Sequence, residues 1–260
     1  MYSADEAKNK LKKLYEDFND SVLYSYFEGI FGDGYCDDIS EPQCAVIHSG
    51  DFYFLAGDHN NDMFCNDAAE LIGKNRSAVV VPDDVSWFEK LNFYLENKLE
   101  TVKRFHTHLC DKGPDKQMLK KKADRINDFP KLSLKRIDKH FYNAALTEKW
   151  SECFVSNFKN YDDYSANGFG YIITDSERII SGASSYSYYS RGVEVELATH
   201  EDYRQQGFAQ IVSAAFLLEC LERGLVPHWD ARNKISLKIA ESSGFVFSDE
   251  YTAFEFKEQN

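Results

Sequence analysis

The chain has 260 residues, 43% of them hydrophobic and 15% aromatic, which is enough for one large hydrophobic core or two smaller ones. Its formal net charge of −13 makes nucleic acid a poor partner, because neutralising phosphates requires a basic face, and it favours a cationic substrate. No run of eighteen apolar residues occurs, and residues 1–6 lack the basic and apolar stretches of a secretory signal. We therefore expect a cytoplasmic protein without a membrane partner.

The cysteine spacing argues against two kinds of small domain. No Cys-x-x-Cys pair occurs, so neither a disulfide framework nor a zinc knuckle is indicated. The six cysteines are Cys36, Cys44, Cys65, Cys110, Cys153 and Cys220. We expect all of them to be reduced thiols.

The first half of the chain mixes helix and strand patterns. Apolar residues recur at helical spacing over residues 4–18. Strand-like runs at 45–48 and 52–55 flank the turn Ser49-Gly50-Asp51, as in a hairpin. Further along we expect a strand at 77–81, a helix at 84–95 and a strand at 101–110. These patterns predict an N-terminal α/β domain over residues 1–128.

A lysine-rich polar stretch follows at residues 111–128. It contains Gly113-Pro114 and three consecutive lysines, and it has no strong apolar period. We expect these lysines to form a solvated helix face. The predicted domain boundary lies at the end of this stretch.

From residue 129 to residue 260 the pattern becomes regular. Strands are expected at 132–137, 169–174, 178–189, 193–199 and 226–230, with two short ones at 245–247 and 251–256. Helices are expected at 138–146, 150–164, 207–223 and 234–243. This order predicts a mixed α/β (α+β) domain with a twisted, largely antiparallel sheet and helices on its faces.

The sharpest local signal is the string Arg204-Gln205-Gln206-Gly207-Phe208-Ala209, between a predicted strand and a long helix. At such a turn, backbone N–H groups point outward from the helix N-terminus and form an anion site. Gly207 has no side chain to block the close approach of a pyrophosphate, and Arg204 adds a positive charge. A capped helix without a ligand can have the same residues, so the surrounding sequence must decide.

At this point the chain resembles the GNAT N-acetyltransferases, whose phosphate loop reads Gln/Arg-x-x-Gly-x-Gly/Ala between the fourth strand and a long helix. A second GNAT hallmark, Asn-x-x-Ala/Ser followed by Gly-Phe, is matched by Asn233-Lys234-Ile235-Ser236 and by Gly244-Phe245. The resemblance covers about residues 130–257 and implies the GNAT fold for residues 129–260. One bacterial branch of the family also carries an N-terminal extension of this length, and here that extension is a candidate for a degenerate copy of the same fold.

The resemblance also implies acetyl-CoA as the cosubstrate. Main-chain groups of Leu197, Ala198 and Thr199 would pair with the pantetheine arm like an added strand, and Asn233 and Ser236 would contact that arm or its neighbourhood. The residues that would surround the pyrophosphate are Arg204, Gln205, Gln206, Gly207, Phe208 and Ala209. The thioester would then lie between the strands that end near residues 199 and 230.

Direct acetyl transfer needs a group that removes a proton from the amine. Glu194 and Glu196 alternate with apolar residues, so both carboxylates face away from the apolar side of their strand. His228 carries an imidazole, which is suited to general-base work. These three residues are the catalytic candidates, and an exposed polar strand face or a structural histidine are the alternatives.

The sequence departs from the family at the general acid. Many GNAT enzymes have a tyrosine seven residues after the motif asparagine, and here that position is Ala240. Tyr251 is one substitute. Otherwise the thiolate leaves unassisted, since a thiol pKa near about 8.5 makes it a fair leaving group.

His106, His108 and Cys110 alternate along a predicted strand and would share one face, a geometry able to hold a metal. No fourth ligand has suggestive spacing, so we expect no metal site there.

The sequence therefore predicts an acyltransferase that moves an acetyl group from acetyl-CoA to a primary amine of a small molecule or a protein. The alternative is a non-catalytic module that senses acyl-CoA, for which Ala240 is the main support. A peptidyl-transfer protein on the same fold would need a basic groove for tRNA, which the charge of −13 opposes. The acceptor and the oligomeric state, a homodimer included, stay open.

Overall fold

The structure is a computed structural model that describes residues 1–257. Its internal contacts divide the chain into two compact units. Unit 1 consists of Met1–Arg104 together with the segment that begins at Glu250, and unit 2 is Phe105–Asp249. Two long strands, β6 (Leu99–Leu109) and β12 (Phe245–Phe256), each contribute residues to both units.

This division differs from the predicted boundary after residue 128. The segment 105–128 belongs to unit 2 because its apolar side chains join the core of that unit. Phe105, Leu119 and Ala123 lie in one buried cluster with residues of the long helix α8 (Phe208–Arg223).

The lysine-rich stretch is helical, as the sequence predicted. It forms α5 (Lys116–Ala123), which packs on α8, and the 3-10 helix η1 (Asp124–Asp128). Not all of its lysines form a solvated face, since the Lys122 ammonium donates to the Ser242 carbonyl at the end of α9 (Lys234–Ser242), and burial lowers the pKa of Lys122. A cation at a helix C-terminus is favourable there because the last carbonyls lack partners within the helix.

Unit 2 is built on a five-stranded sheet in the order β11-β10-β9-β8-β7. Its strands are β7 (Leu132–Arg136), β8 (Gly170–Asp175), β9 (Arg178–Tyr189), β10 (Gly192–Thr199) and β11 (Val226–His228). Only β10 and β11 run parallel, and the other pairings are antiparallel. The predicted twisted, largely antiparallel sheet with flanking helices is confirmed.

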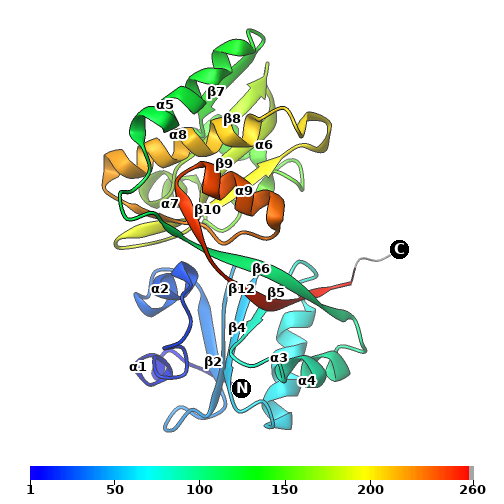
Figure 1. The fold of residues 1–260 in the computed structure, drawn as a ribbon. Helices are drawn as coiled ribbons and strands as arrows, with labels where there is room; N and C mark the ends of the chain where they lie inside the picture. Colours follow the sequence, from blue (N-terminus) through cyan, green and yellow to red (C-terminus); the bar gives the residue numbers. More distant parts are fainter. Residues whose placement is uncertain (258–260) are drawn as a thin grey trace. The chain divides into compact units, whose positions relative to one another are not determined.

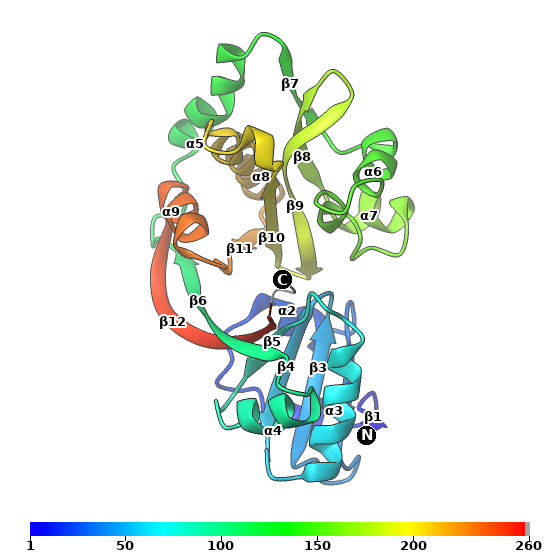
Figure 2. The same ribbon diagram turned by 90° about the vertical axis from the view of Figure 1, so that its right-hand side faces the viewer.

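Helices cover both faces of this sheet (Figure 2). On one face α5 and α8 pack with inward residues such as Val193 and Val195. The other face carries α6 (Lys139–Ala145), the 3-10 turn η2 (Glu152–Phe154) and α7 (Tyr161–Asn167).

Unit 1 has a seven-stranded sheet in the order β1-β2-β3-β4-β5-β12-β6. Its first five strands are β1 (Tyr2–Ser3), β2 (Asp33–Cys36), β3 (Cys44–Ser49), β4 (Phe52–Gly57) and β5 (Val79–Pro82). Its helices are α1 (Lys8–Leu11), α2 (Ser21–Phe27), α3 (Asp62–Gly73) and α4 (Trp87–Tyr94). The core of this unit includes the fully buried Trp87, with Phe64 of α3 and Leu55 of β4.

The first five strands of the two units pair in the same order and in the same directions. Figure 1 labels β2, β4 and β5 of unit 1 and β7 to β10 of unit 2. From β1 to β4, and from β7 to β10, successive strands are antiparallel, whereas β5 and β11 run parallel to the strand before them. A helix, α3 or α8, makes each parallel crossover. A further helix and a long strand then follow in each unit, α4 with β6 and α9 with β12. The N-terminal half therefore repeats the strand topology of the C-terminal half.

Several local predictions differ from the structure. Within residues 4–18 only α1 is α-helical, and the predicted helix at 150–164 is a 3-10 turn followed by α7. Asn160 explains why the helix predicted at 150–164 is interrupted. Its backbone is extended, and its side chain accepts a hydrogen bond from the Asp163 N–H at the start of α7. The two short C-terminal strands are one continuous β12, and α2 and α3 were not predicted.

Candidate active site

The parallel strands β10 and β11 of unit 2 pair only briefly. Their pairing begins with Gly192 opposite Val226 and ends with Glu194 opposite His228, although β10 continues to Thr199. Immediately after Glu194 the register of β10 against β9 shifts, as at a β-bulge, which bends a strand locally. In the described part of the chain, the last residues of β10 therefore have no partner on the β11 side.

A cavity of about 790 Å³ lies beside this unpaired part of β10. All but one of the predicted cofactor-binding residues line it: Leu197, Ala198, Thr199, Arg204, Gln205, Gly207, Phe208, Ala209, Asn233 and Ser236. Gln206 is not among the lining residues. The volume falls within the range of about 300–1,000 Å³ that is usual for small-molecule sites.

Six lining residues were missed at the level of sequence. They are Trp150, Tyr203, Gln210, Arg232, Ile235 and Ile239. Trp150 lies before η2, and Tyr203 ends the 3-10 helix η3 (Glu201–Tyr203), so both lie outside the phosphate loop and the asparagine motif. Arg232 directly precedes the motif asparagine, and that proximity was the one signal available for it.

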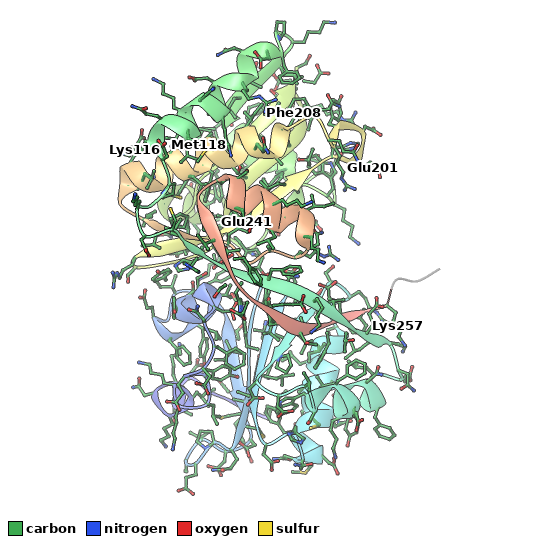
Figure 3. The ribbon with its side chains drawn as sticks, in the orientation of Figure 1. Lys116, Met118, Glu201, Phe208, Glu241 and Lys257 are labelled. Atoms are coloured by element: carbon green, nitrogen blue, oxygen red, sulfur yellow. The ribbon has the colours of Figure 1, made fainter. Side chains whose placement is uncertain are left out.

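The N-terminus of α8 has no side-chain cap among the described residues. Gly207 occupies the N-cap position with φ of 86°, and Gln205 before it is also left-handed with φ of 63°. Phe208 begins the helix (Figure 3). Because the first-turn N–H groups of a helix lack partners within it, they and the helix dipole favour an anion at this point.

The other α-helices of unit 2 are capped differently. At the start of α5, α6, α7 and α9, a side-chain oxygen accepts from first-turn backbone N–H groups; the capping residues are Asp115, Asp138, Asn160 and Asn233. In these four helices a side chain therefore accepts from first-turn N–H groups, whereas in α8 no described side chain does so, and the start of α8 lines the cavity.

Two arginines supply positive charge near this terminus. The Arg204 guanidinium donates through Nε to the Thr199 carbonyl at 3.2 Å, which holds it beside the end of β10. The terminal nitrogens of Arg125 lie 3.4 and 3.5 Å from the point where a Cβ of Gly207 would be. Arg125 comes from η1, outside any motif, so the sequence did not indicate it.

Asn233 and Ser236 each have a role in the fold. The Asn233 side-chain oxygen accepts from the N–H groups of Ile235 and Ser236, both at 3.0 Å, and so caps α9. The Ser236 hydroxyl accepts from the indole N–H of Trp229 at 3.1 Å. These bonds shape the cavity wall on the β11 side.

The structure brings two of the three catalytic candidates together. Glu194 and His228 are direct cross-strand neighbours at the point where β10 and β11 separate. Glu194 is 7% exposed, and its carboxylate accepts from the Asp230 N–H at 2.8 Å. Glu196 lies further along β10, where its carboxylate accepts from the N–H of Leu197 at 3.2 Å.

His228 lies beside a tyrosine. Its Nε2 lies 3.0 Å from the hydroxyl of Tyr189 at the end of β9. Burial lowers the pKa of His228 from 6.5 to about 4, so the imidazole is neutral at physiological pH. A base with so low a pKa accepts protons poorly near neutrality.

Neither Ala240, at the position of the family's tyrosine, nor the suggested substitute Tyr251 lines the cavity. Ala240 is fully buried in the core of unit 2. Tyr251 lies in unit 1, where its hydroxyl accepts from Nε of Arg104 at 3.2 Å.

His106 of β6 and Cys110, the residue after β6, have separate partners. Nδ1 of His106 lies 2.9 Å from a carboxylate oxygen of Asp249, and the Cys110 thiol donates to the Gly113 carbonyl at 3.0 Å. Across residues 1–257 no three His, Cys, Asp or Glu side chains are grouped as metal ligands would be.

Comparison with known proteins identifies the family. The model of the GNAT acetyltransferase family matches residues 12–254. The chain is also 26% identical over 256 residues to the uncharacterized N-acetyltransferase YdfB of Bacillus subtilis, covering 95% of this chain and 94% of that protein. The chain belongs to the GNAT acetyltransferase family.

Solved structures agree with this assignment. A GCN5-related N-acetyltransferase-like protein from Streptococcus suis superposes with a TM-score of 0.87 at 32% identity, over 98% of this chain and 100% of that chain. A tandem GNAT protein from the clavulanic acid biosynthesis pathway gives a TM-score of 0.53 at 10% identity, over 98% of this chain and 96% of that chain, which shows the fold alone.

The GNAT fold and the acyltransferase enzyme predicted from the sequence are confirmed. Within residues 1–257, no helix combines the length and apolar content that crossing a bilayer requires.

Proposed function

We propose that this GNAT enzyme transfers the acetyl group of acetyl-CoA to a primary amine, by direct attack of the amine on the thioester. One observation carries the proposal: a single cavity joins the uncapped N-terminus of α8 to the unpaired backbone of β10. The first feature suits the pyrophosphate of CoA, and the second suits the amide groups of its pantetheine arm.

The pyrophosphate end fits the residues present. The first-turn N–H groups of α8 and the guanidinium of Arg204 offer hydrogen-bond donors and positive charge, and Gly207 keeps the approach open. Each helix–anion contact of this kind contributes about 0.3–1 kcal/mol, and up to about 2 kcal/mol when partly buried.

The pantetheine end fits the backbone of β10. Leu197, Ala198 and Thr199 line the cavity, and no residue of β11 pairs with them. Extended ligands commonly bind such an edge by adding a strand, because the main-chain groups then form hydrogen bonds. Asn233 and Ser236 form the facing wall.

The proton of the acceptor amine requires a base near the separation of β10 and β11. Acetyl-CoA supplies an activated acetyl group there. Glu194 lies at that separation and Glu196 directly precedes the cavity-lining Leu197, so these two carboxylates are the candidates for the base. The thiolate can leave without a dedicated acid, because a thiol pKa near about 8.5 is low enough at neutral pH.

The charge of the chain supports a cationic acceptor, on a small molecule or a protein. A negative field attracts ammonium groups and raises their rate of encounter.

Calorimetry of CoA binding tests the proposal. Gly207→Glu places bulk and negative charge where the pyrophosphate should lie, so it should abolish CoA binding. Gly224→Glu is the matched control, because Gly224 ends the same helix with a φ of 68° and has open space around its Cβ position. Strain from a positive φ is common to both variants. Unchanged CoA affinity in Gly207→Glu would refute the assignment of this loop.

A further inference from the structure

A row of polar side chains crosses three strands of unit 2 where β10 and β11 separate. Ser187 of β9 pairs with Glu194 of β10, and Glu194 pairs with His228 of β11. Directly opposite residues present their side chains on the same face of a sheet. Ser187, Glu194 and His228, here called the polar row, are therefore neighbours on one face.

The Ser187 hydroxyl is the member of the polar row that the fold does not explain. Ser187 is 1% exposed, and its Oγ has no hydrogen-bond partner within residues 1–257. The hydroxyls of Ser184 and Ser185 on the same strand both donate to the Phe169 carbonyl. Because buried polar atoms are nearly always paired, the unpaired Ser187 hydroxyl indicates a missing ligand group or ordered water beside Glu194.

Tyr189 reaches the polar row from two residues further along β9. It pairs with Gly192, and its hydroxyl lies 3.0 Å from Nε2 of His228 on the far side of β10. A Cβ at position 192 would lie 2.7 Å from Cε1 of the Tyr189 ring. It would lie still closer, at 2.3 Å, to the Val226 carbonyl oxygen, so glycine at position 192 leaves room both for β11 and for this ring.

We infer that Ser187 and Tyr189 complete the acceptor end of the active site, which takes a small primary amine in its cationic form; this inference rests on the proposed function. The Ser187 hydroxyl accepts a hydrogen bond from the ammonium, or from one water between the ammonium and Glu194. Tyr189 is a positioning residue that fixes the orientation of His228 beside Glu194.

The proton and electron changes at this site balance. The ammonium gives one proton to the Glu194 carboxylate, directly or through the water on Ser187. The freed nitrogen lone pair forms the C–N bond to the acetyl carbon, and the C–S bond breaks. As the amide forms, the nitrogen loses its second proton to the departing thiolate, directly or through solvent, and Glu194 returns its own proton to solvent.

Two probe nucleophiles test the role of the polar row. Propylamine is almost fully protonated at neutral pH, whereas hydroxylamine is largely unprotonated and needs no base before it attacks. Ser187→Ala and Tyr189→Phe should each lower kcat/KM for propylamine by about tenfold or more, because ammonium binding and proton transfer are impaired. The rate with hydroxylamine and the CoA affinity from calorimetry should stay within about twofold.

Stability separates this role from a structural one. Ser187→Ala removes an unpaired buried hydroxyl, so its melting temperature should be unchanged or raised. Ser185→Ala is the matched control: it removes a hydroxyl that bonds to Phe169, so it should lower the melting temperature and leave the kinetics of the folded enzyme unchanged.

The outcomes distinguish this inference from the proposed function. Loss of CoA binding by the wild-type protein would overturn the proposed function. Normal CoA binding with unaltered propylamine kinetics in both variants would overturn the inference alone. A wild-type enzyme that binds CoA but acetylates neither probe would also contradict it, since the site should accept small amines.

Discussion

The two units share a strand order but treat the helix of their parallel crossover differently. In unit 1 the side chain of Asn61 accepts from the Phe64 N–H at 3.1 Å and caps α3, and Asp62 adds a negative charge in the first turn. In unit 2 the N-cap of the corresponding α8 is Gly207, and no side chain of residues 1–257 caps this helix. The same topology therefore offers an anion site only where the helix terminus is left uncapped.

The two units also differ in how their parallel strands pair. β4 and β5 pair over four residues, from Phe52 opposite Val79 to Leu55 opposite Pro82, all of them apolar. β10 and β11 pair over three residues and then diverge, with the carboxylate of Glu194 at the separation. We propose that unit 1 is a degenerate copy of the GNAT fold in which core residues fill the position of the site.

The largest expected effect comes from removing the proposed base, Glu194 of unit 2. A similar substitution in unit 1 should have no effect on catalysis. Glu194→Gln should lower kcat by about 10²–10⁴ while leaving CoA affinity nearly unchanged, because proton transfer and pyrophosphate binding use different groups. Thiol release with an identified acceptor measures the first effect, and calorimetry measures the second. Asp58→Asn, at the end of β4 in unit 1, is the matched control and should leave both unchanged.

Glu196→Gln and His228→Ala belong in the same experiment. We expect His228→Ala to have a smaller effect on kcat than Glu194→Gln, because Glu194 is the proposed base and His228 lies beside it. Full activity in all three variants would place the base outside β10 and β11.

The second expected effect is on stability below neutral pH. The folded-state pKa of His228 is about 4, below the ordinary 6.5, so protonation favours the unfolded chain. The stability that the neutral imidazole contributes is present above about pH 6.5 and is lost as pH falls toward about 4, by roughly 1–2 kcal/mol after allowance for partial exposure.

Urea unfolding at pH 7 and pH 5 measures this loss. His228→Gln should reduce the difference between the two pH values. His48→Gln in unit 1 should reduce it less, because burial lowers the pKa of His48 but the charge of Asp33 opposes that shift. An equal or larger effect at His48 would contradict the assignment to unit 2.

The third prediction concerns the guanidinium beside Gly207. Arg125→Gln should weaken CoA binding about fivefold to tenfold, because a charge next to the pyrophosphate is lost. Lys121→Gln, an exposed cation on the adjoining helix α5, should change the affinity less than twofold. Isothermal calorimetry at one ionic strength compares the two variants, and equal losses would indicate only a general effect of charge.

The smallest expected effect tests the capped helix of unit 1. Asn61→Ala should lower the free energy of unfolding by about 1 kcal/mol, the usual value of a lost N-cap, with no change in CoA affinity. Asn60→Ala, at the exposed neighbouring position, should stay within about 0.5 kcal/mol. Denaturant curves give both free energies of unfolding. A loss of CoA binding in Asn61→Ala would contradict the proposal that CoA binds at α8 of unit 2.

The predictions that rested on residues close together in the sequence agreed best with the structure. The periodic apolar residues of α8 and the preceding string ending at Gly207 lie within one stretch of chain, so their arrangement follows from helix geometry. The break at Asn160 was harder to predict, because one capping side chain outweighed the local composition.

The sequence by itself determined the helix terminus at Gly207, the strand before it and the motif around Asn233, because each uses contacts between residues close in the chain. Only the tertiary structure placed Arg125 against Gly207, or aligned Ser187 with Glu194 and His228. Those neighbours depend on strand register and helix packing, which the distant parts of the chain decide together and which no local period encodes.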